Sequence, residues 1–163
     1  MAIRNIVNDG DEILLKKSRP VEQFDEKLGQ LLDDMRDTLK DAEGAGLAAV
    51  QVGVLRRVCI IDVGDGVTEL INPEIIESSG EDEAVEGCLS FPSIWGLVIR
   101  PQTVKIKAKN RFGQTIMIKG TDLKARAICH EIDHLNGVVF KCHVSRYLND
   151  KEVERYNRRK KKK

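Results

Sequence analysis

The stretch ICHEIDHLNG, residues 128–137, places His130, Glu131 and His134 in the order H-E-x-x-H. On an α-helix each residue advances by about 100°, so the two histidines are expected one turn apart on one face. Their imidazoles could bind one metal ion, and Glu131 would lie at the edge of that face as a base rather than a ligand. The surrounding apolar residues indicate a buried helix, in which histidines need polar partners. The stretch therefore predicts the metal site of a hydrolase; the alternative is a surface helix with two unrelated histidines.

This helix is expected to run from Thr121 or Asp122 to Asn136, with Gly137 just after its end. Residues 25–42 carry apolar residues at i, i+3, i+4 and i+7, which predicts an N-terminal amphipathic helix.

Strands are expected on both sides of the central helix. The apolar run at 58–62 is typical of a buried strand, and the alternating segments 102–110 and 114–120 predict a hairpin. Another short strand is expected at 138–142. Pro73 would restrict any strand around it to a sheet edge, or break it.

Two segments complete the expected organisation. Residues 81–100 are expected to be irregular, because they contain two glycines and a proline. Residues 145–163 are expected to form a basic C-terminal helix or tail. Together the segments predict an α+β fold, a single domain over residues 1–163, with mixed or antiparallel strands packed around the central helix that carries HEIDH.

Composition narrows the class of protein. The chain has 163 residues, 41 % of them apolar and 33 % charged, with a net charge of +1. That balance favours a globular protein and no general attraction to nucleic acid or membrane. The first residues lack the apolar core of a secretory signal, so we expect a cytoplasmic protein with no membrane contact. The four cysteines are then expected to be thiols or metal ligands rather than disulfides.

A third metal ligand has several candidates. His143 has no motif around it, and Cys129 would point away from His130 on the helix. Cys59 and Cys142 lie in apolar runs that favour the core. Cys88, in the glycine- and proline-containing stretch EGCLSFP, has the context of a loop ligand, and thiolate is a ligand for ferrous iron, zinc and cobalt.

Three segments taken together resemble the motifs of the peptide deformylase family: GAGLAAVQ at 44–51, EGCLS at 86–90 and HEIDH at 130–134. Each match is moderately specific alone, whereas the three in this order are highly specific. The resemblance implies the family's reaction, which removes the N-formyl group from the initiator methionine of newly made polypeptides and releases formate.

The resemblance also implies the ligands and their metal. Cys88, His130 and His134 would bind one divalent ion, usually Fe²⁺ in this family. Because iron with a thiolate ligand is open to oxidation, Zn²⁺, Ni²⁺ or Co²⁺ could occupy a purified sample.

Three residues are expected to carry the chemistry. Metal-bound hydroxide would attack the formyl carbon, with Glu131 as the general base that later protonates the departing amine. The resemblance implies that the side-chain amide of Gln51 and the backbone N–H of Leu89 donate to the oxyanion of the tetrahedral intermediate.

The substrate is expected to bind along two segments. Leu123, Arg126 and Ala127 lie on the histidine face of the helix and could line a methionine pocket, with the stem of Arg126 packed and its head in solvent. A solvated surface position is the alternative for Arg126. Gly44 and Gly46 would allow close approach of an extended peptide. The backbone of Gly46 could pair with that peptide as one β-strand pairs with another.

Five further residues have weaker assignments. Phe91 and Trp95 could form the other pocket wall, although Trp95 suits the core equally well. Arg100 is expected to pair with Glu86, and Asp133 could orient a metal ligand.

The tail is strongly basic. Residues 145–163 contain nine basic and three acidic residues, a net charge of +6, which leaves about −5 for the rest of the chain. The tail could dock on ribosomal RNA near the emerging peptide, in a salt-dependent way; a solvated, frayed end is the alternative.

Two other functions fit parts of the sequence. A zinc peptidase shares H-E-x-x-H, but no downstream motif offers its third ligand. A metal-stabilised protein that binds RNA through its tail would not need Glu131. The combination of Glu131, Gln51 and Cys88 favours catalysis.

Overall fold

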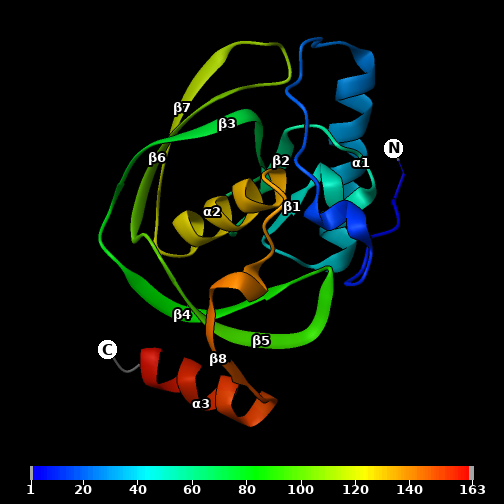
Figure 1. Ribbon diagram of the computed structural model, residues 1–163. Helices are drawn as coiled ribbons and strands as arrows, with labels where there is room; N and C mark the ends of the chain where they lie inside the picture. The colour runs from blue at the N-terminus through cyan, green and yellow to red at the C-terminus, as the bar shows by residue number, and fades with distance from the viewer. Residues whose placement is uncertain (1, 162–163) are drawn as a thin grey trace.

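The computed structural model describes residues 2–161 as a mixed α+β domain of two antiparallel sheets and three α-helices (Figure 1). The helices are α1 (Glu26–Ala42), α2 (Leu123–Leu135) and α3 (Asp150–Lys161). The larger sheet has the order β1-β2-β3-β6-β7, with β1 Gly46–Ala48, β2 Val58–Ile61, β3 Thr68–Ser79, β6 Thr103–Lys109 and β7 Thr115–Thr121. The smaller sheet has the order β4-β5-β8, with β4 Asp82–Cys88, β5 Phe91–Arg100 and β8 Val144–Leu148. Within this described range no helix is both long and apolar enough to cross a membrane.

Helix α1 forms where the sequence predicted it. Asp25 caps its start by accepting a hydrogen bond from the backbone N–H of Leu28. It ends at Glu43, which adopts the left-handed conformation with φ 55°. Its apolar face packs on β1 and β2, which buries Leu28, Leu32 and other residues of one hydrophobic cluster.

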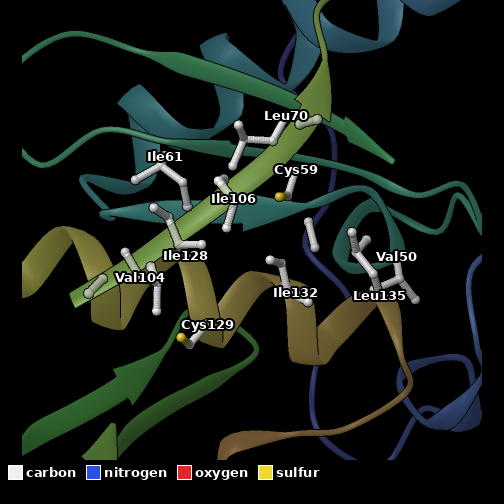
Figure 2. Packing of buried hydrophobic residues seen from close by; sticks show 14 residues of the cluster. Val50, Cys59, Ile61, Leu70, Val104, Ile106, Ile128, Cys129, Ile132 and Leu135 are labelled. Atoms are coloured by element: carbon white, nitrogen blue, oxygen red, sulfur yellow. The ribbon is translucent and has the colours of Figure 1, made fainter. Parts of the chain in front are cut away.

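Helix α2 packs against one face of the larger sheet (Figure 1). Ile128, Ile132 and Leu135 project from it toward side chains of the strands, among them Ile61 and Ile106 (Figure 2). Burial of this apolar stripe turns the opposite face of α2, which carries the histidines, toward the smaller sheet.

Residues 81–100 are not irregular as predicted. They form the antiparallel pair β4 and β5, which turns between Cys88 and Phe91. At the glycines that suggested a loop, another side chain packs closely on the backbone instead. A Cβ on Gly87 would lie 2.4 Å from the ring of Trp95, and one on Gly96 would lie 2.6 Å from Val144.

The prediction for Pro73 was also wrong, because β3 runs through it and lies between β2 and β6 inside the larger sheet. The register shifts between Ile71 and Glu74, and Asn72 has φ 52°. This bulge takes the proline, which has no N–H, out of the ladder.

The C-terminal segments differ from their predictions as well. In place of a strand at 138–142, Phe140–His143 forms a 3₁₀ helix, whose Phe140 ring packs edge-on against Phe91. The expected tail helix begins only at Asp150, because the preceding residues pair with β5 as strand β8. The last two lysines of the tail, 162–163, lie outside the described residues.

Candidate metal centre

The three ligand candidates come together where the end of β4 meets α2. Cys88 Sγ lies 3.3 Å from His134 Nε2, and His134 Nε2 lies 3.2 Å from His130 Nε2. All three ligand atoms lie within 4.8 Å of one another. His134 is fully buried, His130 nearly so, and Cys88 is partly exposed.

This arrangement fits a small divalent cation. Around a tetrahedral ion with Zn–N near 2.05 Å and Zn–S near 2.3 Å, two nitrogens stand about 3.3 Å apart and a nitrogen and a sulfur about 3.5 Å apart. The observed distances of 3.2 Å between the two nitrogens and 3.3 Å between nitrogen and sulfur are close to these values. One thiolate and two imidazoles are also the ligand types that suit Fe²⁺, Zn²⁺ or Co²⁺.

Glu86 stands behind His130, with its Oε2 2.8 Å from Nδ1. Nδ1–H donates to this carboxylate, which leaves Nε2 free to face a metal. Arg100 donates to both carboxylate oxygens, through Nε at 3.1 Å and Nη2 at 2.7 Å, as the sequence suggested. Burial disfavours the charged carboxylate, but the bonds from His130 and Arg100 hold the pKa of Glu86 well below its usual range.

Asp133 does not contact a metal ligand. Its Oδ2 accepts from Arg100 at 2.7 Å and lies 3.1 Å from Nε2 of His143, which is half-exposed. The contact that could orient a ligand, expected of Asp133, is made by Glu86 with His130 instead. Sequence reasoning missed this role, although Glu86 opens the EGCLS motif.

The surroundings shift the pKa values of the two imidazoles in opposite directions. Burial and the charge of His130 lower the pKa of His134 to about 3, so this ring is neutral, as a ligand must be. Burial alone would lower the pKa of His130 too, but the charge of Glu131 and contacts with Cys88 and Glu86 raise it. A cation at Nε2 would compete with that proton.

Glu131 is buried beside the ligands, with 3 % of its surface exposed. Its Oε1 has no hydrogen-bond partner among residues 2–161. Burial, with the charge of Glu86 adding to it, raises the pKa of Glu131 to about 7. A carboxyl group with this pKa can both accept and donate a proton near neutral pH.

Gln51 is buried on the sulfur side of the site, in the 3₁₀ turn that follows β1. Its Oε1 accepts from the N–H of Ala48 at 3.0 Å, which orients the amide. Its Nε2 lies 3.1 Å from Ser90 Oγ and 3.6 Å from Cys88 Sγ. Leu89 directly follows Cys88 and packs its side chain against the α1 cluster.

A pocket of about 450 Å³ opens beside these groups. It is lined by all five predicted substrate-binding residues: Gly44, Gly46, Leu123, Arg126 and Ala127. Phe91 and Trp95 line it too. Trp95 is 38 % exposed and so is not a core residue.

The expectation that the head of Arg126 reaches solvent was wrong, and so was the alternative of a solvated position. The side chain is 5 % exposed, and its guanidinium bonds to Glu86 and Asp82. The buried carboxylate of Glu86 and the partly exposed one of Asp82 offer this cation partners that could not be foreseen from the helix alone.

Comparison with known proteins agrees with this geometry. The polypeptide deformylase family model matches residues 3–149. The chain belongs to the polypeptide deformylase family.

Its relatives include the peptide deformylase of Caldicellulosiruptor bescii, 54 % identical over 94 % of this chain and 93 % of that protein. The peptide deformylase of Acetivibrio thermocellus is also 54 % identical, over 95 % of this chain and 91 % of its own length.

Solved deformylases share the fold. The crystal structure of the Thermotoga maritima enzyme matches with a TM-score of 0.87 at 39 % identity, over 89 % of this chain and 99 % of the other. The Legionella pneumophila enzyme matches with a TM-score of 0.85 at 41 % identity, over 99 % of both chains. The family's metal-dependent removal of the N-formyl group from newly made peptides, expected from the three motifs, is therefore confirmed as the activity of this chain.

Proposed function

We propose that residues 1–163 act as one deformylase domain in which Cys88, His130 and His134 hold the metal and Glu131 moves the proton. The observation that carries this proposal is the convergence of the three ligand atoms within 4.8 Å, beside a buried carboxyl group. A peptidase site would need a third ligand from beyond the HEIDH helix; here that place is taken by Cys88, and His143 contacts Asp133 instead.

The metal is expected to be Fe²⁺, with Zn²⁺, Ni²⁺ or Co²⁺ as substitutes in a purified sample. When bound, such an ion supplies Lewis acidity toward the formyl oxygen and a water molecule. The neutral imidazole of His134 and the His130 ring held by Glu86 present their Nε2 atoms to it.

Glu131 serves as the proton carrier. Its unpartnered Oε1 is free to accept a proton from the attacking water, and its raised pKa lets it return that proton to the departing amine. Without that transfer the amine would leave as a strongly basic anion, which is unfavourable in a buried site.

Two donors stabilise the negative charge that develops on the formyl oxygen. Nε2 of Gln51 is held beside Cys88 by the bond from Ala48 N–H to its own Oε1. The backbone N–H of Leu89 belongs to the residue after the cysteine ligand. Each such donor is typically worth about 3 kcal/mol in the transition state.

The pocket beside the proposed metal site receives the methionine side chain of the substrate. Leu123 and Ala127 give it an apolar wall, and Gly44 and Gly46 leave room for the peptide backbone. Its volume of about 450 Å³ is ample for one methionine side chain.

The decisive experiment is formate release from a formyl-Met-Ala peptide by anaerobically prepared, iron-loaded protein. The parent should release formate, Cys88→Ala should lose metal and activity, and Glu131→Gln should keep the metal but lose turnover. Activity in a metal-loaded Glu131→Gln variant would remove Glu131 from the mechanism.

A cytoplasmic location and docking on ribosomal RNA are proposed as well. The support for docking is a helix α3 whose Arg155, Arg158 and Arg159 are all exposed. Removal of residues 156–163 should reduce ribosome co-sedimentation at low salt, and added salt should weaken the parent's binding steeply. Unchanged co-sedimentation of the truncated protein would end the docking proposal.

A further inference from the structure

Arg126 is a buried cation one helical turn before His130. Its Nη1 donates to Glu86 Oε1 at 3.0 Å and to the carbonyl of Val98 at 2.9 Å. Its Nη2 donates to the carbonyl of Asp82 at 2.6 Å and lies 3.3 Å from Oδ2 of the same residue. The guanidinium therefore spans from the start of β4 to the carboxylate behind the metal ligand.

Glu86 is held from three directions. Its Oε1 accepts from Arg126 and from Nε of Arg100, and its Oε2 accepts from Nη2 of Arg100 and from Nδ1 of His130. These four bonds use the lone pairs that a carboxylate offers, so the group has a single orientation.

The two arginines flank Glu86, and each has an outer carboxylate of its own. Arg100 reaches Asp133 at 2.7 Å, and Arg126 reaches Asp82 at 3.3 Å. Each guanidinium thus lies between two negative charges, which offsets the cost of burying it. Removal of Arg126 would leave Oε1 of Glu86 with Nε of Arg100 as its remaining donor, at 3.1 Å, and so would loosen the carboxylate that holds His130.

We infer that Arg126 is a positioning residue for the metal site: acting through Glu86, it fixes the imidazole of His130 so that Nε2 faces the cation. This inference rests on the proposed ligand set, and it gives Arg126 a role beyond lining the methionine pocket. Partners that orient a ligand from behind typically contribute 10- to 100-fold to metal affinity.

The test measures Co²⁺ affinity by competition titration, together with the visible absorption spectrum of the Co²⁺ protein, so it does not depend on turnover. Arg126→Met should weaken Co²⁺ binding roughly 10- to 100-fold and alter the spectrum. Lys124→Met is the matched control, since Lys124 lies on the same helix and forms a peripheral ion pair with Asp65; it should bind Co²⁺ as the parent does.

A double-mutant cycle with Glu86→Gln separates positioning from general damage to the fold. Glu86→Gln should itself weaken Co²⁺ binding. If Arg126 acts through Glu86, adding Arg126→Met to Glu86→Gln should weaken Co²⁺ binding by less than about threefold more. Equal losses in both backgrounds, or parental affinity and spectrum in Arg126→Met, would overturn the inference.

Folding of each apoprotein is checked by circular dichroism. Arg126→Gln, whose amide is too short to span both carboxylates, replaces Arg126→Met if the latter does not fold, and the same outcomes apply. If neither variant folds, Arg126 is a residue of fold stability and the inference falls. Failure of the parent to bind Co²⁺ would instead remove the proposed ligand set.

Discussion

The carboxylate of Glu131 lies against the backbone of Gly46. A Cβ added to Gly46 would stand 2.6 Å from Glu131 Oε2 and 3.0 Å from its Cγ. Gly46 opens β1 and Glu131 lies on α2, so the Glu131 side chain packs directly on the strand backbone. The absence of a Cβ at residue 46 is therefore what allows the carboxyl group its place in the site.

Gly46→Ala should displace Glu131 and reduce kcat for formate release by up to about 100-fold, because a shift near 1 Å can cost that much. Metal content should stay parental, since the three atoms nearest to the new methyl group all belong to Glu131, which is not a proposed ligand. Gly29→Ala is the control: it lies in α1, its nearest neighbour is 3.8 Å away, and it should leave activity unchanged. Parental kcat in Gly46→Ala would show that the carboxyl group is not held by this contact.

Gln51→Ala should lower kcat by roughly 100- to 1,000-fold with little change in KM, because it removes one donor to the developing oxyanion. Steady-state formate release at several peptide concentrations separates the two constants. Gln114→Ala, which alters an exposed glutamine far from the pocket, should behave as the parent. A rise in KM with unchanged kcat would mean that Gln51 binds substrate and transition state equally.

Glu69→Gln should destabilise the protein in a pH-dependent way. Arg111 donates to Glu69 at 2.6 Å and Arg36 at 2.8 Å. Burial alone would raise the pKa of Glu69, but these two arginines lower it below the ordinary 4.5. Because the folded state prefers the charged form, the ion pairs add stability above about pH 4.5 and lose it as the pH falls through the lowered pKa.

Urea denaturation of parent and Glu69→Gln checks this expectation. The free energy of unfolding should differ by roughly 1 kcal/mol at pH 7, and the difference should shrink steadily below pH 4.5. Glu77→Gln, on the exposed half of the same strand, should show no such trend. A difference that grows toward low pH would contradict the assigned sign.

Metal removal should lower the temperature of thermal unfolding. The proposed ligands come from β4 and α2, so a cation bound by all three would stabilise only the folded arrangement. Chelation should therefore shift the midpoint of the parent, while Cys88→Ala should respond much less. Equal shifts in both proteins would indicate that the chelator acts elsewhere.

Local rules predicted the parts of the site that lie within one element. The four-residue spacing of His130 and His134 is a property of any helix, so their convergence followed from sequence. Cys88 is 46 residues from His134. Its loop context made it a candidate ligand, but the resemblance to a family, not spacing, settled the choice. The partners of Arg126 likewise depend on the position of β4, and helical periodicity gives no information about that position.

The errors in predicting the fold have the same origin. Gly87 and Gly96 suggested a loop because glycine is common in turns, yet here Trp95 and Val144 fill the space above them. Pro73 lacks an N–H, but the bulge at Asn72 removes the need for one. The pairing of β4 with β5 brings Trp95 over Gly87, and the pairing of β5 with β8 brings Val144 over Gly96, neither of which local residue preferences contain.

The unequal burial of the three proposed ligands has a kinetic consequence. His130 and His134 share one rigid helix and are almost fully enclosed, whereas Cys88 ends an edge strand and is partly open to solvent. Departure of the ion would therefore begin with local fraying of the β4–β5 turn, which swings the sulfur aside while the imidazoles stay in place. With this ligand set, the residence time of the metal would be set by how often that hairpin opens.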